Sequence, residues 1–493
     1  MSTQSTVPSP PAAPDRRRRL LVLAICCLSL FIVGLDNTVV NVALPVIQQD
    51  LHAPASGLQW IIDAYTLVLA SLLMLSGSVA DRIGRRRVFR AGLLLFVLGS
   101  LLCSLAPGLG WLIAFRALQA VGGSMLNPVA MSIITNTFTD KRERAQAIGV
   151  WGGVIGISMA LGPLIGGFLV DSAGWPAVFL VNIPVGLAAF ALTFRYVPES
   201  RAPRPRRLDP VGQLLMVVML GCGTAAIIEG PGYGWTSPVI LTLAALAGSA
   251  LVCFPFWERR TAEPLIDPRF FHSVPFTGAT LTAVCAFASL GGFLFLNTLY
   301  LQNVRHYSPV QAGLWTLPMA GLTLVAAPVS GRIVGLRGPR LPLVVAGLAM
   351  AASGLLLTRL TVDASAALLI AAYALFGLGF GLVNAPITNS AVSGMPLAQA
   401  GVAAAVASTS RQIGQSLGVA VIGTAVTTAV VGPVDFTTAT HIGWWIITAL
   451  GLAVLALGLL TTTPWAVATA ARVAARFGAG SGAVRGAPTE RLR

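Results

Sequence analysis

Apolar runs of about 20 residues recur along the whole sequence, and each is long enough to cross the ~30 Å hydrocarbon core of a bilayer as a helix. Hydrophobic residues make up 55% of the chain and charged residues only 10%, a balance that soluble domains rarely show. A membrane barrel would show short segments of alternating polarity instead. The pattern predicts an all-α membrane protein with fourteen spans, near residues 20–43, 57–79, 88–106, 110–133, 146–170, 174–196, 211–230, 238–257, 275–301, 311–334, 341–360, 365–390, 403–430 and 441–463.

The basic residues fall on one side of this predicted layout. They precede the first span at 16–19 and gather after spans two, four, six, eight, ten and fourteen, whereas the opposite loops hold only Arg305 and Arg359. Because positive charge marks the cytoplasmic side, we expect both termini in the cytoplasm and the chain in the inner (cytoplasmic) membrane of a cell. The net charge of +15 then reflects topology, and no nucleic-acid partner is expected.

Several other classes of site are disfavoured by the sequence. The six cysteines lie in apolar runs without metal-ligand spacing, so we interpret them as small core residues and expect no metal and no cofactor. The first apolar run continues through Asp36 without a cleavage motif, which indicates an uncleaved first span. No phosphate-cradling motif of the ATPase type is present, so transport driven by ATP is not expected.

A weak internal repeat relates the two ends of the chain. The stretch GSVADRIGRRR begins at Gly77 and GRIVGLRGPR begins at Gly331, and their glycines share the same spacing. Asn127 in span four matches Asn384 in span twelve. Repeated halves with a site at their interface are typical of transporters. The predicted organisation begins with a disordered basic N-terminus (1–19) and a six-helix bundle (20–200). Linkers with two inserted helices (201–269), a second six-helix bundle (270–465) and a cytoplasmic tail (466–493) follow.

Two acidic residues interrupt the apolar runs of the first half. An unpaired carboxylate in hydrocarbon costs at least ~2.5–3.5 kcal/mol, so Asp36 must face a cavity or a partner. Asp36 could be a proton-binding group, or a structural carboxylate satisfied by Asn37, Asn41 or a neighbouring helix. Asp63 shares a helical face with Gln59 and Thr66, which predicts a cavity-lining stripe; solvation near the outer interface is the alternative.

The spans also carry two arginines. Arg116 shares a helical face with Gln119 and Asn127. It could form an ion pair with Asp36 that breaks when Asp36 is protonated, or a fixed ion pair that only holds two helices together. Arg411 lies in the cytoplasmic half of span thirteen, where it either extends toward the interface or contacts an anionic group.

Several motifs together resemble the major facilitator superfamily, and within it the fourteen-helix drug:proton antiporter family. GSVADRIGRRRV resembles the superfamily's loop motif between helices two and three. LDNTVVNVALP, RALQAVGG, GISMALGPLIGG and WPAVFLVNIPVG resemble motifs of the first, fourth, fifth and sixth helices of this antiporter family. The resemblance covers about residues 20–465 and implies a major facilitator fold of two six-helix bundles plus two inserted helices.

The resemblance implies roles for particular residues. It implies a role in proton coupling for Arg116, and Asp63 resembles a position that some family members use for cationic drugs or for coupling. From the residues themselves, Asp36 is the expected proton-binding group, and Gln119 is expected to lie beside Asp36 and Arg116 and support them. The loop motif implies a cytoplasmic gate, formed by Gly77, Asp81, Arg82, Gly84, Arg85 and Arg86. The fifth-helix motif implies an interface that seals antiporters against leak, formed by Gly156, Gly162, Pro163, Gly166 and Gly167. Close helix packing alone would also explain these glycines, and topology alone would explain the arginines.

Further polar and aromatic side chains are candidates for the wall of a substrate cavity, namely Asn37, Asn41, Gln59, Thr66, Gln119, Asn127, Tyr300, Trp315, Tyr373 and Asn384. In the second half, the positions that match Asp36 and Asp63 are Leu290 and Leu317, so spans nine to fourteen carry no central acid. That departure argues against a dedicated exporter of dications.

The sequence therefore favours a proton-coupled efflux antiporter, not an enzyme, that exports amphipathic drugs or antibiotics. Its expected partners are a small-molecule substrate, protons and the lipid bilayer, and we expect a monomer. Export of an endogenous metabolite or an envelope lipid is the alternative. A polytopic membrane enzyme is a more distant alternative, because the sequence has no cluster of acidic or metal-binding residues and no long loops outside the spans.

Overall fold

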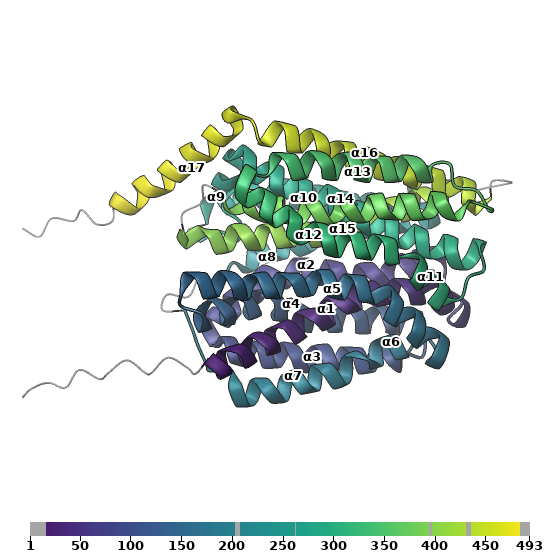
Figure 1. Ribbon diagram of the computed structural model, residues 1–493, viewed down its shortest axis with the longest axis horizontal. Coiled ribbons are helices and arrows are strands. Elements are labelled where there is room, and N and C mark those ends of the chain that lie inside the picture. The colour runs from purple at the N-terminus through teal and green to yellow at the C-terminus, as the bar shows by residue number, and fades with distance from the viewer. Residues whose placement is uncertain (1–15, 203–207, 262, 394–396, 430–434, 484–493) are drawn as a thin grey trace, which may run out of the picture.

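The computed structural model describes residues 16–202, 208–261, 263–393, 397–429 and 435–483, and within these ranges it contains helices and no β-strand (Figure 1). Twelve helical segments of the described chain are long and apolar enough to cross a membrane. Two further helices, α5 (Lys141–Ala173) and α15 (Leu397–Ala429), are 33 residues long, and some of their side chains lie outside the described set.

The first bundle is built from the N-terminal helices. Within it α1 packs against α5 and α7, α2 packs against α4, and α3 packs against α4 and α7. Apart from α5, its helices are α1 (Arg16–Asp50), α2 (Ala55–Ile83), α3 (Arg85–Ser104), α4 (Leu109–Thr137), α6 (Ala177–Leu180) and α7 (Asn182–Tyr196).

The second bundle repeats the same pairings. Here α10 packs against α15, α12 against α14, and α13 against α14 and α16. In Figure 1 this bundle lies above the first one. Apart from α15, its elements are α10 (Val274–Leu299), η2 (Tyr300–Val304), α11 (Pro309–Trp315), α12 (Leu317–Arg337), α13 (Arg340–Leu357), α14 (Ala366–Val392) and α16 (Phe436–Thr461).

The repeated glycines have a common structural reason. Gly84 follows the last residue of α2 and Gly338 follows the last residue of α12, and their φ angles are 128° and 80°. Residues with a side chain rarely adopt such angles, so glycine allows each chain to leave its helix and turn directly into the next one.

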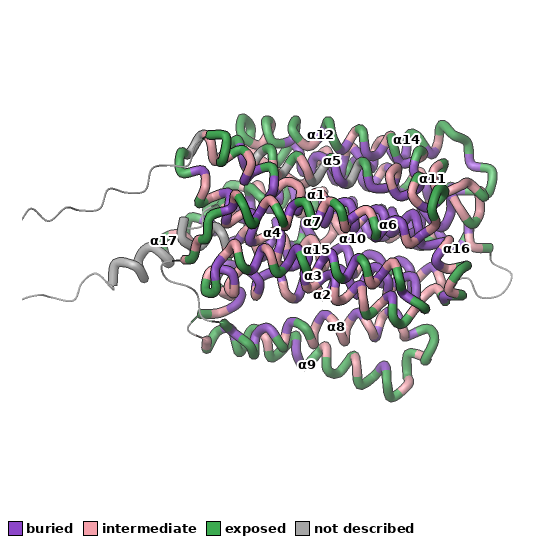
Figure 2. The backbone as a smooth tube through the Cα atoms, turned by 90° about the horizontal axis from the view of Figure 1, so that it is seen from below, coloured by how far each residue is buried: buried purple, intermediate pink, exposed green. Residues whose placement is uncertain are grey.

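Two inserted helices, α8 (Pro210–Tyr233) and α9 (Pro238–Arg260), stand between the bundles in sequence. Helix α8 packs against α2 and α15, one helix from each bundle, and α9 packs on α8. The Asp209 carboxylate caps α8 by accepting from the Gly212 N–H at 2.9 Å, and it also accepts from the Trp257 indole of α9 at 2.9 Å. Figure 2 shows α9 at the edge of the molecule, mostly exposed, as expected for a helix that faces lipid.

One end of the molecule gathers basic residues, and we call it the basic end. There Arg18 donates to the Tyr196 carbonyl at 3.2 Å, and the Arg85 N–H donates to the Ser200 carbonyl at 2.9 Å. The start of α1, the start of α3 and the end of α7 therefore meet at this end. Helix α17 (Pro464–Ala483) also lies there, at the left of Figure 1.

Two hydrogen bonds between the bundles lie at the end opposite the basic end. Gln302 donates to the Val42 carbonyl at 2.8 Å, and the Val310 N–H donates to the Asp171 carboxylate at 3.2 Å. Between the bundles α2 packs against α15, and α5 packs against α11 and α12.

The structure corrects three details of the predicted layout. Span six is interrupted at Val181 and span ten at Thr316, and each consists of two helices. In both, a proline shortly after the break, Pro184 or Pro318, has no N–H to offer the carbonyl four residues earlier. The prediction of disorder for 1–19 is wrong for 16–19, which form the first turn of α1. Residues 1–15 lie outside the described chain.

Candidate functional site

Asp36 is completely buried on α1 and is the centre of a polar cluster within the first bundle. Its Oδ2 accepts a hydrogen bond from Nη1 of Arg116 at 2.5 Å. Its Oδ1 accepts from Nε2 of Gln119 and from Nδ2 of Asn182, both at 2.9 Å. Helix α4 supplies Arg116 and Gln119, and α7 supplies Asn182, so this one carboxylate joins three helices of the bundle.

Arg116 has partners besides Asp36. Its Nη1 donates to Oε1 of Gln119 at 2.6 Å, and its Nε donates to the Ile61 carbonyl of α2 at 3.2 Å. The guanidinium also lies over the Tyr65 ring, 4.2 Å from the ring centroid. A cation held by a carbonyl, an amide and an aromatic face can stay in place when the charge of its carboxylate changes.

Small residues bring the helices around this cluster together. A side chain at Gly99 of α3 would lie 2.5 Å from Cα of Gln119, so glycine at this position allows α3 and α4 to touch. That approach places the Ser100 hydroxyl 2.7 Å from Nε2 of Gln119, which thereby contacts both Ser100 and Asp36.

Three members of the cluster, Asn182, Ser100 and Tyr65, are absent from the predicted site. Asn182 lies in the stretch WPAVFLVNIPVG and begins α7 directly after the break at Val181. In the sequence, Asn182 stands out as a polar amide two residues before Pro184 within an apolar span. Ser100 offers no comparable signal, because a serine hydroxyl in an apolar helix commonly bonds to its own backbone. Tyr65 joins the cluster through its ring, and its position in the sequence does not indicate that contact.

Asp63 is also completely buried, but its surroundings differ from those of Asp36. Its Oδ1 accepts from the Thr66 hydroxyl at 3.2 Å, and its Oδ2 has no hydrogen-bond partner among the described residues. Gln59, on the same face of α2, packs against Gly423 of α15. The predicted stripe on α2 therefore faces the second bundle, and the alternative of an acid simply solvated at the interface is wrong.

The predicted amide residues lie in different parts of the molecule. Asn41 is buried and donates to the Asn37 carbonyl at 3.0 Å, within α1. Asn127 is half-buried on α4, and its Oδ1 has no partner in the described chain. Asn384 is half-buried on α14 and donates to the Phe380 carbonyl at 3.4 Å. None of the hydrogen bonds described here links these amides to Asp36.

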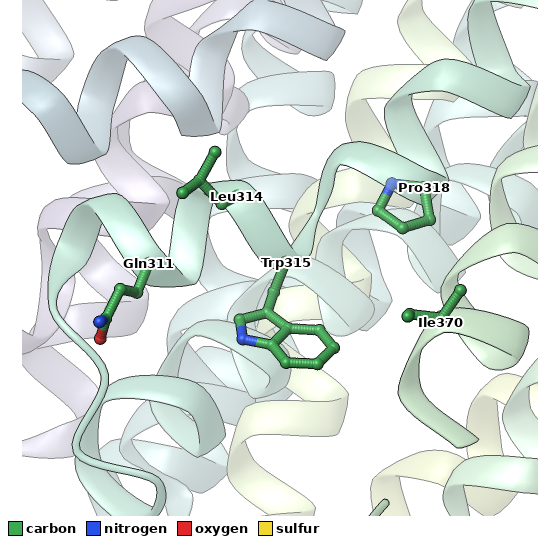
Figure 3. A pocket seen from close by; sticks show the side chains of 5 residues that line it. All are labelled: Gln311, Leu314, Trp315, Pro318 and Ile370. Atoms are coloured by element: carbon green, nitrogen blue, oxygen red, sulfur yellow. The ribbon is translucent and has the colours of Figure 1, made fainter. Parts of the chain in front are cut away.

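The aromatic candidates make their contacts away from the Asp36 cluster. Tyr300 is buried and donates to the Thr361 carbonyl at 2.8 Å, and Tyr373 is buried and donates to Asn297. Trp315 lines a shallow pocket of about 240 Å³ where α11 meets α12 (Figure 3). The other lining residues are Gln311, Leu314, Pro318 and Ile370. The structure does not bring these three aromatic residues together with Asp36.

The glycines of the fifth-helix motif lie at close helix contacts. A side chain at Gly162 would lie 1.8 Å from the Thr38 hydroxyl of α1, and one at Gly166 would lie 2.8 Å from Val39. Gly167 packs on the Pro309 carbonyl of α11, and Gly313 of α11 packs on the Pro163 carbonyl. Gly156 lies in α5, outside the residues whose surroundings are described. This motif therefore joins α5 to α1 and to the second bundle.

The loop-motif residues form a compact corner at the basic end. Asp81 accepts from Nε and Nη2 of Arg85 at 3.0 and 2.8 Å. Gly84 makes the turn, and beside it Glu199 accepts from the Arg86 N–H at 3.1 Å. Arg82 lies exposed at the same corner, and Gly77 faces Pro128 of α4. Glu199 was absent from the predicted gate, although its place before a basic linker was a usable signal.

The part of the chain that the structure describes contains no group of three or more His, Cys, Asp or Glu side chains suited to a metal ion. The six cysteines are unpaired.

Comparison with known proteins identifies the family. The family described as the Major Facilitator Superfamily matches residues 26–419, which is most of the chain. The multidrug resistance protein Stp of Mycobacterium tuberculosis is 39% identical over 409 residues, which cover 83% of this chain and 76% of that protein. The tetracenomycin C resistance and export protein of Streptomyces glaucescens is 38% identical over 421 residues, which cover 85% of this chain and 78% of that protein.

Solved structures show the same architecture. A bacterial homologue of the human drug peptide transporters superposes with a TM-score of 0.64 at 17% identity, covering 93% of this chain and 99% of that one. At this level of identity the likeness concerns the fold. Together with the match over residues 26–419, it means that the chain is a multi-pass membrane protein that belongs to the Major Facilitator Superfamily.

Proposed function

We propose that this protein is a proton-coupled antiporter of the fourteen-helix drug-exporting type, which exports amphipathic drugs or antibiotics from the cell. The observation that carries the proposal is the buried ion pair of Asp36 and Arg116 inside a transporter fold. Charged groups at such depth are expensive and usually mark an ion or proton pathway. The names of the relatives from Mycobacterium and Streptomyces support drugs and antibiotics as the substrates.

The proposed topology has fourteen spans in the cytoplasmic membrane. Helices α5 and α15 are long enough to add one span each to the twelve candidate segments. The basic end then faces the cytoplasm, because arginines gather there and the opposite loops hold few. The protein works as a transporter and not as an enzyme.

Proton coupling follows from competition for the Asp36 carboxylate. When a proton binds Asp36, the carboxyl no longer attracts the guanidinium, and Arg116 retains Gln119, the Ile61 carbonyl and the Tyr65 ring. Neutralising the carboxylate changes the balance of charge between α1 and α4, and with it the relative stability of the two orientations of the transporter. When the site faces the cytoplasm, Arg116 favours the charged carboxylate again, and the proton leaves.

The driving force is sufficient for resistance. A membrane potential of 100 mV supplies ~2.3 kcal/mol per charge, and one unit of pH difference supplies ~1.36 kcal/mol. One proton per cycle therefore supports a concentration gradient of roughly 500-fold for a neutral substrate.

The gate and the seal are proposed from the same fold. The Asp81–Arg85 corner at the basic end would control opening toward the cytoplasm. The α5 contacts with α1 and α11 would close the opposite end against leak. Asp63, whose Oδ1 accepts from the Thr66 hydroxyl, is the second acidic group available for coupling or for a cationic substrate.

The test is an efflux assay in a bacterial host that lacks its own drug pumps. Cells that express the protein should retain less of several amphipathic compounds than control cells that carry an empty vector, and a protonophore should abolish the difference. Cells that express Asp36→Asn at the same membrane level should behave like the control cells. Efflux that survives the protonophore would contradict proton coupling, and no efflux of any compound would contradict the proposed substrate class.

A further inference from the structure

Arg411 is a second intramembrane arginine, and its surroundings differ from those of Arg116. It lies half-buried on α15, where Nη2 donates to the Thr388 hydroxyl of α14 at 2.6 Å. Nη1 lies 3.4 Å from the Ser408 hydroxyl, and Nε has no partner among the described residues. A guanidinium carries five N–H donors, so two weak hydroxyl partners leave most of its capacity and all of its charge unmatched.

The second bundle cannot supply a counter-charge. Between Asp267 and Asp435 the sequence contains a single acidic residue, Asp363, which lies in the loop between α13 and α14. In the first bundle, by contrast, Asp36 balances Arg116 at 2.5 Å. An intramembrane charge without a partner is costly, so it is expected to meet a partner of opposite charge during function.

The side chains around Arg411 suit an aromatic ligand. The Arg411 guanidinium lies 6.0 Å from the centroid of the Phe287 ring of α10, and Phe287 packs edge-on against Phe380 at 5.1 Å. Asn384, one turn beyond Phe380 on α14, is half-buried, and Thr388 is exposed. Three helices of the second bundle thus present a cation, aromatic faces and polar groups in one place.

We propose that Arg411 binds the anionic group, a carboxylate or phenolate, of an aromatic substrate during export. The inference rests on the proposed transport function and adds a substrate class to it. A guanidinium recognises carboxylate and phenolate oxygens by charge-assisted hydrogen bonds, and the phenylalanine rings supply an apolar face for the aromatic part.

An anionic substrate also fits the energetics of a proton antiporter. A proton that enters and a monoanion that leaves both move positive charge inward, so the membrane potential drives two charge equivalents per cycle. A cationic substrate exchanged for one proton would gain nothing from the potential. Anionic compounds should therefore be exported against steeper gradients than cationic compounds of the same size.

The experiment compares two dyes that share a xanthene ring system and differ in charge: fluorescein, an anion at pH 7.5, and rhodamine 6G, a permanent cation. Binding is measured by fluorescence anisotropy with the purified full chain in detergent. Loss of one charge-assisted contact corresponds to a weakening of about tenfold or more. Arg411→Gln should weaken fluorescein binding by that factor and leave rhodamine 6G binding unchanged, and Arg411→Lys should restore part of the loss.

The matched control is Arg337→Gln, which removes an exposed positive charge from the last turn of α12 and should leave the binding of both dyes unchanged. If Arg411→Gln weakens the binding of both dyes equally, Arg411 only supports packing and the proposal is wrong. If the binding of fluorescein is not weakened, the proposal is overturned directly. A wild-type protein that binds no fluorescein would also overturn it. Efflux of rhodamine 6G from cells tests the transport function independently of these results.

Discussion

At the scale of single residues, the Asp36 carboxylate depends on three side chains from two other helices. Arg116, Gln119 and Asn182 each donate one hydrogen bond to it, and Gln119 also donates to Ser100. Donors to a carboxylate stabilise its charged form over its protonated form. A change in any of the three donors should therefore alter proton-driven transport, without any change to the acid itself.

Asn182→Leu should slow proton-driven transport. The substitution keeps the approximate size of the side chain and removes one donor, so the charged carboxylate loses a contact of about 1.5–3 kcal/mol. The initial rate of transport should fall by roughly tenfold, as expected for the loss of a contact of that energy. The measurement is initial-rate transport in vesicles under an imposed pH gradient.

Asn136→Leu is the control, because Asn136 is exposed on α4 and its amide donates to the Ser132 carbonyl of its own helix. It should leave the transport rate unchanged. A transport rate of Asn182→Leu identical to that of the wild type would mean that the Asn182 donor does not influence proton coupling at Asp36.

The sequence predicted part of this cluster. Asp36 and Arg116 stand out because charges within apolar spans are rare, and Gln119 follows from its spacing to Arg116. Asn182 could not be assigned in the same way, since its contact with Asp36 depends on how α7 packs against α1 and on the break at Val181. Tyr300 and Tyr373 were placed in the cavity because aromatic spacing does not reveal which face of a helix turns inward.

At the scale of helices, α5 is held against its neighbours by positions that lack a side chain. Gly162 is the clearest case, since a Cβ there would lie 1.8 Å from the Thr38 hydroxyl. Gly162→Ala should destabilise the protein by about 1–3 kcal/mol, because the Thr38 side chain must be displaced from its packed position. The measurement is the melting temperature of the purified protein in detergent, together with proton leak in vesicles without substrate.

Gly153→Ala on the same helix is the matched control, because nothing lies within 4 Å of a Cβ at that position. It should leave the melting temperature and the leak unchanged. Equal effects of the two substitutions would show that α5 responds to alanine in general and not to loss of the contact with α1.

The corner between α2 and α3 predicts a different kind of defect. Asp81→Asn removes the charge that holds Arg85 at 2.8 Å, at the basic end and not at the Asp36 cluster. Transport should slow several-fold while equilibrium binding of substrate stays near the wild-type value, because the proposed role of Asp81 is in opening the cytoplasmic gate and not in contacting substrate. Equal losses in binding and in flux would place Asp81 in the substrate site.

Helix positions were largely predictable, and helix interruptions were not. Long apolar runs indicate spans because a bilayer demands length and apolarity. The breaks at Val181 and Thr316 are short, and the residues there keep helical backbone angles, so the apolar pattern continues across them. The prolines that follow at Pro184 and Pro318 were visible in the sequence, but a proline within a membrane helix does not always interrupt it.

At the scale of the whole molecule, two bundles with the same helix pairings stand side by side, and α8 contacts both of them. The order of the bundles in the chain was visible from the repeated glycines and from Asn127 and Asn384. The way the inserted helices dock was not visible, because α8, which contacts both bundles, is apolar on most faces and carries no periodic signal for its partners.

The orientation in the membrane is open to a direct test. A reporter that is active only in the periplasm, fused after Arg493, should give no signal, because the arginine-rich end is expected to face the cytoplasm. The same reporter inserted in the loop at Asp363, on the opposite side, should be active and serves as the positive control. A strong signal from the fusion at Arg493 would reverse the proposed topology.

The central claim is that Asp36 binds and releases the proton that drives export. Its most direct test is substrate-induced proton release from the purified protein, followed with a pH indicator in weakly buffered detergent solution, alongside uphill transport into inverted vesicles under an imposed pH gradient. The wild type should release protons when substrate binds. Asp36→Asn imitates the protonated state, so it should fold, release no proton and lose uphill transport, whereas Asp63→Asn should still release protons. Full proton release and uphill transport by Asp36→Asn would contradict the account and move coupling to Asp63.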